Sequence, residues 1–129
     1  MRLLLDTQIF IWWDGASQRM PPGLLALLND ESTLLFLSVA SIWEIQIKHQ
    51  LGKLDLDRPL PQIISEQQQT NQLKVLAVQA EDIYGLQQLP FYHKDPFDRL
   101  IIAQALLNDL ALASVDAIFQ KYPVRLVNG

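Results

Sequence analysis

The chain contains no cysteine, and its 129 residues include only two histidines. These absences exclude thiol nucleophiles, thiolate zinc sites, a disulfide framework and a histidine-rich metal site. No uncharged apolar run approaches the length of about 20 residues that a membrane-spanning helix needs. The first apolar run, Leu3–Leu5, is closed by Asp6 and is far too short for a signal peptide. We therefore expect a cytoplasmic protein without a membrane partner.

Positive charge is also scarce, with 10 Lys and Arg residues against 14 Asp and Glu residues and a net charge of −4. This balance argues against a protein that holds nucleic acid by a bulk positive field alone. It does not exclude a nuclease, because active-site carboxylates that are matched by bound cations still count as negative in the formal total. The placement of the acids therefore matters more than their number.

The hydrophobic residues make up half of the chain, which predicts one domain over residues 1–129 with a conventional apolar core. Apolar runs without alternation are separated by segments of helical periodicity. This pattern predicts an α/β fold, with a parallel sheet of four to five strands and helices on both faces. The expected strands are 3–5, 34–37, 75–78, 110–114 and an edge strand at 124–127, and the expected helices are 9–13, 24–28, 39–50, 60–71, 80–88 and 96–108.

Two of these helices have recognisable beginnings. Ser38 or Ser41 is suited to cap one helix, and the spacing from Ser41 to Glu44 fits a capping box. Asp95 is a natural N-cap for another helix, with Pro96 as its first residue. Both beginnings place an acid in or near the first turns of a helix.

Two acids follow strands of the expected sheet. Asp6 ends the first strand, and Asp116 follows the fourth. Because the carboxyl ends of parallel strands meet at one edge, we expect both side chains at the edge where open α/β sheets bind ligands.

Two further acids occupy the inward stripes of their helices. They are Glu44, in the helix at 39–50, and Asp98, in the helix that begins at Pro96. An unpaired carboxylate costs several kcal/mol to bury, and the chain offers too few inward cations to pair all four acids. The apolar residues that share these stripes are Ala40, Ile47 and Leu51 for Glu44, and Ile101, Ile102 and Ala105 for Asp98.

Each acid also has a local explanation. Asp98 could be the capping-box partner of Asp95, and Glu44 that of Ser41. The two acids that follow strands could bond neighbouring backbone amides. These explanations do not account for the convergence of four acids from four segments, whose mutual repulsion a divalent cation with oxygen ligands relieves.

A cluster of carboxylates without His or Cys favours Mg²⁺ or Mn²⁺ over Zn²⁺. A site of this kind, with one or two ions, activates a water molecule and stabilises the leaving oxygen in phosphoryl transfer. The leading reaction class is therefore metal-assisted hydrolysis of a phosphodiester.

Four segments of the sequence carry a family resemblance. They are LLLDT, SIWEIQIKHQLGKL, LPFYHKDPFDRLIIAQA and SVDAIFQKYPV, and together they span nearly the whole chain. The chain resembles the PIN-domain nucleases, and most closely the small VapC-like toxins of bacterial type II toxin–antitoxin pairs.

The resemblance assigns a role to each of the four acids. The invariant acids of the family fall on Asp6, Glu44 and Asp98, and Asp116 stands at the more variable fourth position. The resemblance implies that these four residues are catalytic and bind Mg²⁺ or Mn²⁺. It further implies an endoribonuclease that hydrolyses RNA, is inhibited by a cognate antitoxin protein and forms a homodimer.

Polar neighbours of these acids each have two explanations. Thr7 and Ser114 are suited to orient a metal-bound water or a carboxylate, or to satisfy backbone groups at the strand ends. Arg99 is suited to a bidentate contact with the scissile phosphate or to a salt bridge with a nearby acid. Lys48 is placed to pair with the acid four residues before it or to reach the RNA backbone.

The chain departs from the VapC-like subgroup at two positions. They are Gln8, where His is frequent, and Ser114, where Thr is common.

Loop residues and aromatic residues offer weaker indications. His93–Lys94 precedes the helix that carries Asp98 and is a candidate RNA contact. Trp12–Trp13 and Trp43 suggest base stacking, but packing in the core or in a dimer is the favoured interpretation. Phe91–Tyr92 is a better candidate for exposed aromatic contacts.

Three other functions compete with the nuclease. The alternative is a catalytically silent interaction module that keeps the fold, although the presence of all four acids argues against it. A phosphoacceptor receiver domain needs paired acids after the first strand, where Thr7 follows Asp6. A phosphatase with Asp6 as nucleophile needs a second acid at the position of Gln8.

Overall fold

The computed structural model describes all of residues 1–129. Five strands form one sheet in the order β3-β2-β1-β4-β5, and every neighbouring pair is parallel. The strands are β1 (Arg2–Leu5), β2 (Leu34–Ser38), β3 (Lys74–Leu76), β4 (Ala111–Ala113) and β5 (Leu126–Val127). The α-helices are α1 (Thr7–Gly15), α2 (Pro22–Leu28), α3 (Val39–Gln50), α4 (Leu60–Asn71), α5 (Ala80–Gly85) and α6 (Pro96–Leu107), with 3₁₀ turns η1 (Ser17–Arg19), η2 (Leu86–Gln88) and η3 (Ala117–Lys121).

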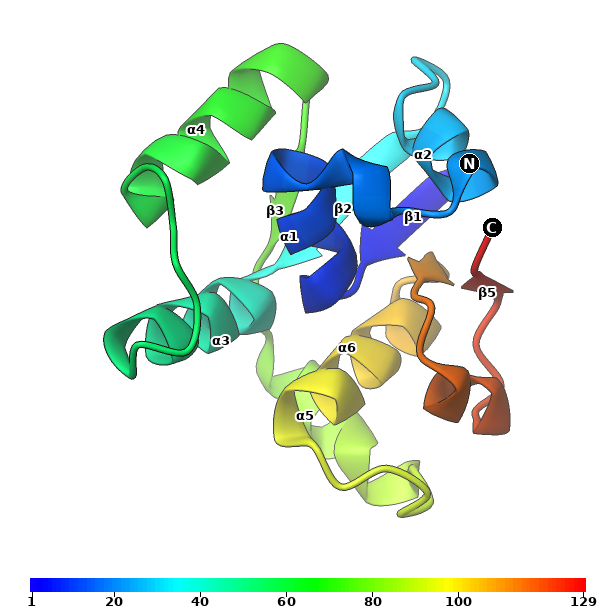
Figure 1. Ribbon diagram of the computed structural model, residues 1–129. Coiled ribbons are helices and arrows are strands. Elements are labelled where there is room, and N and C mark those ends of the chain that lie inside the picture. The colour runs from blue at the N-terminus through cyan, green and yellow to red at the C-terminus, as the bar shows by residue number, and fades with distance from the viewer.

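The sheet separates two apolar clusters, because successive residues of a strand point to opposite faces. Leu3 and Leu5 of β1 pack into the larger cluster with α1, α2 and α4, whereas Leu4 packs into the smaller one with α6. In Figure 1, α1, α2 and α4 lie on one side of the sheet and α5 and α6 lie on the other. The predicted α/β fold, with a parallel sheet covered on both faces, is confirmed.

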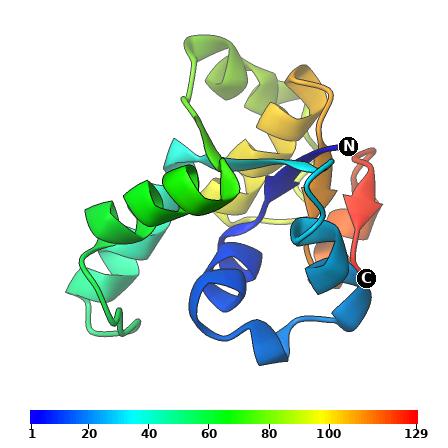
Figure 2. The ribbon, with the colours of Figure 1, turned by 90° about the horizontal axis from the view of Figure 1, so that it is seen from above.

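Helices α3 and α4 both extend beyond the sheet at the same end of the molecule, on the left in Figure 1 and in Figure 2. The inward stripe predicted for α3 is therefore only partly correct. Ala40 and Glu44 are buried, but Ile47 is half-buried and Leu51 is 63% exposed. The carboxyl end of α3 has left the sheet, so its apolar residues have no core to cover.

Most predicted elements are confirmed with shifted ends. The helix predicted at 60–71 is α4, and the strand predicted at 110–114 is the shorter β4. The segment 80–88 divides into α5 and the 3₁₀ turn η2. With 12 residues in the longest of them, none of the helices has the length and apolar character to span a bilayer.

Candidate metal centre

Two of the four acids lie at the same edge of the sheet, as predicted. Asp6 directly follows β1 and Asp116 comes shortly after β4, and these two strands are parallel neighbours. The backbone N–H of Asp6 donates to the carbonyl of Ala113 (3.0 Å), which joins the two strand ends. Oδ1 of Asp6 also caps α1 by accepting a 2.7 Å hydrogen bond from the N–H of Ile9. One oxygen of this buried carboxylate thus orients the helix that follows.

Glu44 is buried in α3 and points toward this edge. Its Oε1 accepts a 2.7 Å hydrogen bond from the hydroxyl of Thr7, and its Oε2 forms a 2.7 Å ion pair with Nζ of Lys48. The predicted i,i+4 pair with Lys48 is confirmed, and its hydrogen bond raises the pKa of Lys48. The predicted capping box is wrong, because Ser38 caps α3 and the Ser41 hydroxyl lies against Thr7 instead.

Asp98 lies in the first turn of α6, whose N-cap is Asp95 as predicted. Oδ1 of Asp95 accepts from the N–H of Asp98 at 3.0 Å. The side chain of Asp98 does not return to the cap. Its Oδ2 instead lies 2.7 Å from Nε2 of His93, a residue of the loop before the helix.

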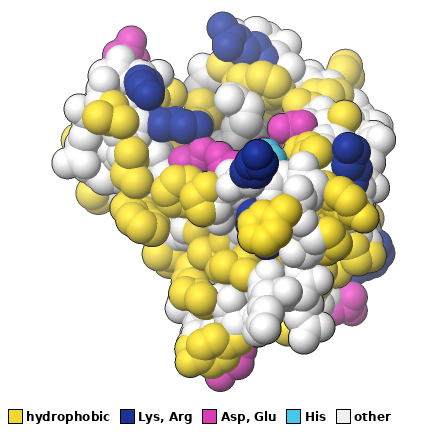
Figure 3. Space-filling view, turned by 90° about the horizontal axis from the view of Figure 1, so that it is seen from below, with side chains coloured by type: hydrophobic (Ala, Val, Ile, Leu, Met, Phe, Trp, Pro, Cys, Tyr) yellow, Lys and Arg dark blue, Asp and Glu magenta, His cyan; other side chains and the backbone are white.

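These acids line a single pocket of about 260 Å³. Figure 3 shows acidic side chains gathered around a hollow, with a histidine beside them and basic side chains nearby. Ligand atoms of three residues, His93, Asp98 and Asp116, all lie within 4.8 Å of one another. The charged residues that line the pocket are the acids Asp6, Glu44, Asp95, Asp98 and Asp116 and the single cation Lys48.

Burial controls the charge of Asp6. Its pKa is raised from the usual 3.8 to about 6, chiefly because burial removes the carboxyl group from water and also because the charges of Asp98 and Asp116 lie nearby. Hydrogen bonds from the Ser114 hydroxyl and from the N–H of Ile9 act in the opposite direction. The folded protein therefore resists ionisation of this carboxyl group in the absence of a cation.

Burial and neighbouring charges also determine the pKa of Asp98. Its partial burial raises its pKa, as do the negative charges of Asp95 and Glu44. The hydrogen bond with His93 lowers it. Two carboxyl groups of the pocket are thus unfavourable as bare anions, which is the electrostatic condition that a bound cation relieves.

The two hydroxyl groups expected beside the acids are buried there. Thr7 donates to Glu44, and Oγ of Ser114 accepts a 3.1 Å hydrogen bond from the N–H of Asp116. Each therefore orients an acidic residue, and Ser114 also holds a backbone group after β4. Gln8 is exposed and also lines the pocket.

The salt bridge predicted as one alternative for Arg99 is absent, and the phosphate contact predicted as the other stays a prediction. The residue is buried, 5% exposed, and its guanidinium forms neither a salt bridge nor part of the acidic pocket. It stacks on the ring of Phe91, with its Cζ 4.0 Å from the ring centroid. Its N–H groups donate to the backbone carbonyls of Leu86, Leu89, Pro90 and His93 at 3.0 to 3.4 Å. Arg99 therefore holds the loop that carries His93.

The tryptophans divide between core and surface. Trp13 is buried in the larger apolar cluster, as favoured, whereas Trp43 is 62% exposed on α3 and packs edge to face on Phe97 at 5.3 Å. The core interpretation of Trp43 is wrong. Phe91 and Tyr92 are exposed as predicted.

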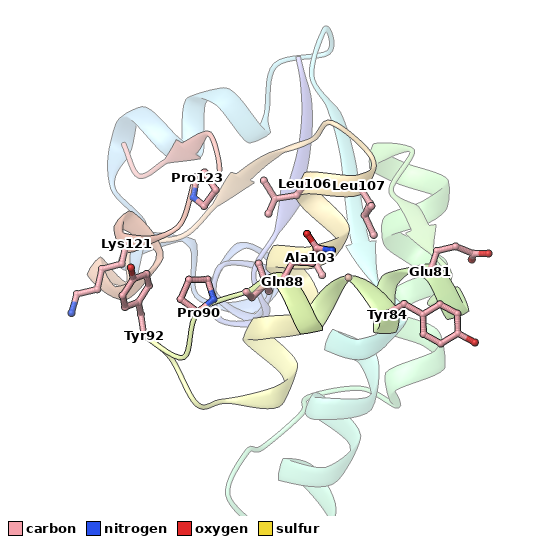
Figure 4. Close-up of a pocket in the computed structure, with 12 residues that line it drawn as sticks. Glu81, Tyr84, Gln88, Pro90, Tyr92, Ala103, Leu106, Leu107, Lys121 and Pro123 are labelled. Carbon is pink, nitrogen blue, oxygen red and sulfur yellow. The ribbon is translucent and has the colours of Figure 1, made fainter.

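A larger cavity of about 760 Å³ lies elsewhere, between α5, α6 and the segment after η3. Figure 4 shows Tyr84 and Glu81 at one end of it and Tyr92 and Lys121 at the other, with Leu106 and Leu107 along the wall. None of the four predicted acids lines it. The smaller pocket is the candidate metal site, because it contains the converging ligand atoms and the perturbed carboxyl groups.

The donors of the acidic pocket fit a divalent cation. Four carboxylates predicted as ligands converge there beside a single lysine, and the most buried of them has a pKa of about 6. Carboxylate oxygens suit Mg²⁺ and Mn²⁺. The expectation of a cluster without histidine is wrong, since His93 reaches it. The sequence does not predict His93 as a ligand. It places His93 in a loop five residues before Asp98, and no pattern in that loop indicates that the ring reaches the site.

The sequence matches a protein family over nearly its whole length. The family described as PIN domain covers residues 3–124. The chain belongs to the PIN domain family. This match spans all four of the predicted acids and confirms the family resemblance. No curated protein sequence matches this PIN domain.

Solved structures share the fold of this PIN domain. A chain of VapBC2 from Rickettsia felis, bound to a promoter DNA fragment, gives a TM-score of 0.75 at 17% identity over 99% of this chain and 98% of that one. DNA-bound VapBC from Salmonella typhimurium gives 0.68 at 16% identity over 98% and 97%. A toxin–antitoxin complex from Klebsiella pneumoniae gives 0.58 at 18% identity over 97% and 95%.

Proposed function

We propose that this PIN domain is a divalent-metal-dependent endoribonuclease that acts in the cytoplasm as the toxin of a toxin–antitoxin pair. The observation that carries the proposal is the acidic pocket beside the ends of β1 and β4, where five carboxylates face one lysine. Two of these carboxylates, Asp6 and Glu44, are buried, and burial of several acids beside a single cation is costly for a purely structural element. It suits a site that operates with a cation.

Asp6, Glu44, Asp98 and Asp116 would hold Mg²⁺ or Mn²⁺. When bound, such an ion supplies an activated water molecule and stabilises the leaving oxygen of a phosphodiester. The RNA backbone is itself anionic, so it approaches five carboxylates only when their charge is matched. This requirement explains why a nuclease can have a net charge of −4.

Neighbouring residues orient two of these acids. The Thr7 hydroxyl and the Lys48 ammonium each hold one oxygen of Glu44. The N–H of Ile9 holds one oxygen of Asp6. Lys48 is 47% exposed at its side chain, so it is also the cation of the pocket best placed to contact a backbone phosphate of the substrate.

The toxin role rests on the likeness of the fold to chains of toxin–antitoxin complexes and on the family resemblance. An antitoxin needs apolar surface on its target, and this chain exposes several large apolar side chains. We propose that a cognate antitoxin binds the domain and inhibits it.

We propose that the domain is also a homodimer. The support is the surface of α3, where Trp43 is 62% exposed and Leu51 is 63% exposed. An apolar groove between α3 and α4 continues this surface, with Ile42 and Ile64 among its lining residues. A second copy packed on α3 would remove these side chains from water.

The experiment that tests the proposal is cleavage of RNA by the purified protein. Wild-type protein is incubated with total RNA in EDTA, and then with Mg²⁺ or Mn²⁺ added back. We expect cleavage only with the metal, and none with the folded variants Asp98→Asn and Asp116→Asn. Cleavage that continues in EDTA, or equally in both variants, contradicts the proposal. Absence of cleavage by metal-loaded wild type favours the silent interaction module.

A second experiment tests the toxin role. Expression of the chain is expected to stop growth, and co-expression of the open reading frame immediately upstream is expected to restore it. Normal growth at high expression would contradict the toxin role while leaving the nuclease in place.

A further inference from the structure

His93 stands out among the residues that the sequence did not assign to the metal site. One of its ring nitrogens, one oxygen of Asp98 and one oxygen of Asp116 lie within 4.8 Å of one another. The three residues come from the loop before α6, from α6 itself and from the segment after β4. The fold therefore brings one nitrogen donor and two oxygen donors together from three separate segments.

The backbone of His93 is fixed on both sides. Its N–H donates a 2.9 Å hydrogen bond to the hydroxyl oxygen of Tyr122, and that hydroxyl donates to the carbonyl of Pro90 at 2.7 Å. Its carbonyl accepts from the buried guanidinium of Arg99 at 3.4 Å. These contacts span 29 residues of sequence on one side and six on the other, so the position of His93 does not depend on its loop alone.

The imidazole ring is held as well. It packs edge to face on the buried ring of Phe119, with the ring centroids 6.1 Å apart. Nε2 lies 2.7 Å from Oδ2 of Asp98, and only 21% of the side chain is exposed. Metal-binding histidines are typically oriented by a supporting set of contacts of this kind.

We infer that His93 is a nitrogen ligand of the divalent-cation site and that this nitrogen makes the site select Mn²⁺ over Mg²⁺. The inference rests on the proposed function, because it concerns the same site. Mg²⁺ is a hard cation that prefers oxygen ligands and retains its water molecules. Imidazole suits transition metals, and Mn²⁺ accepts carboxylate and imidazole ligands together.

The competing role for His93 is to orient Asp98 without touching the cation. The hydrogen bond between the two side chains serves this role equally well in the absence of an ion. The two roles differ in one observable, which is direct electronic coupling between the histidine nitrogen and bound Mn²⁺.

The experiment is a pulsed electron paramagnetic resonance measurement on the full chain, labelled with ¹⁵N-histidine and loaded with Mn²⁺. The chain has two histidines, and His49 is exposed on α3 with its Nδ1 3.0 Å from the carbonyl of Leu54. We expect ¹⁵N coupling in the wild type and in the matched control His49→Gln, and its loss in His93→Gln. Mn²⁺ that binds the wild type without histidine coupling overturns the inference, and this readout needs no variant to fold.

Binding of the metal ions alone, measured by titration calorimetry at one pH, provides the second readout. His93→Gln is expected to weaken Mn²⁺ binding at least as much as the loss of a residue that only supports a ligand does, which is about tenfold or more, and to leave Mg²⁺ binding nearly unchanged. Equal loss for the two metals overturns the selectivity. Failure of the inference is distinguishable from failure of the proposed function, because a protein that binds Mn²⁺ and cleaves RNA without nitrogen coupling loses only the inference.

Discussion

The hydroxyl of Thr7 donates a 2.7 Å hydrogen bond to Oε1 of Glu44, and this bond links the first residue of α1 to the middle of α3. Both side chains are buried. The carboxylate of Glu44 consequently has a donor on each oxygen, Thr7 on one and Lys48 on the other. The geometry of the acidic pocket thus depends on a contact between residues 37 positions apart.

Replacing Thr7 with Val keeps the shape of the side chain and removes the donor. The variant leaves a buried carboxylate oxygen without its partner, which should cost about 1 to 3 kcal/mol of unfolding free energy. Urea denaturation measures this loss. Thr7→Ser, which retains the hydroxyl, is the control and is expected to unfold near the wild-type midpoint. Equal midpoints for Thr7→Val and wild type would show that the bond contributes nothing.

Asp6→Asn is expected to stabilise the metal-free protein above pH 6. The pKa of Asp6 is raised from 3.8 in the unfolded chain to about 6 in the folded protein, chiefly by burial. Folding therefore favours the protonated carboxyl group. The stability that this group contributes is complete below about pH 4 and is lost as the pH rises through about 6. The asparagine has no charge to bury and still caps α1. The stabilisation should reach about 3 kcal/mol at pH 7 to 8 and should vanish near pH 4.

Thermal unfolding in EDTA across this pH range measures the effect of Asp6→Asn. Asp30→Asn is a suitable control, because Asp30 is an exposed acid whose pKa is lowered by hydrogen bonds from Ser32. A stability difference for Asp6→Asn that does not change between pH 4 and pH 8 would contradict the assigned burial effect.

Arg99→Met is expected to destabilise the fold by about 3 kcal/mol, because the guanidinium donates to four backbone carbonyls and methionine donates to none. Chemical denaturation measures the loss. Arg125→Met is the control, since Arg125 is exposed and its nearest acid, Asp109, is exposed as well. Wild-type stability together with loss of RNA binding in Arg99→Met would contradict the structural role and favour the phosphate contact.

Trp43→Glu is expected to convert the proposed homodimer into a monomer. The substitution places a charge on the exposed face of α3, where desolvation in an interface would be costly. Sedimentation equilibrium measures the mass of the assembly. Tyr84→Glu, on an exposed position of α5, is the matched control and should remain dimeric. A dimeric Trp43→Glu variant would move the interface away from α3.

The two acids at the edge of the sheet, Asp6 and Asp116, could be predicted from the sequence because their placement depends on local patterns. Apolar runs mark β1 and β4, and parallel strands oblige the acids that follow them to share one edge. Glu44 could be predicted from the helical stripe of α3, although that stripe fails at Leu51, where the helix extends beyond the sheet.

The misassigned parts of the site depend on contacts between distant residues. Ser41 and Glu44 have the spacing of a capping box, but the Thr7 hydroxyl, which is far away in the sequence, binds Glu44 instead. The segment from Leu86 to His93 has no periodicity that reveals its path. Arg99 and Tyr122 determine that path, so neither the structural role of Arg99 nor the arrival of His93 at the site could be read from local patterns.

The central claim is that Asp6, Glu44, Asp98 and Asp116 hold a divalent cation. The most direct measurement is the anomalous scattering of manganese in crystals of the wild-type protein grown with Mn²⁺. We predict a peak in the pocket between β1, α3, α6 and the segment after β4, with carboxylate oxygens at bonding distance. Crystals of Asp98→Asn grown in the same way should lack it. Wild-type density in which the four carboxylates bind only protein donors, with no manganese peak among them, would contradict the account.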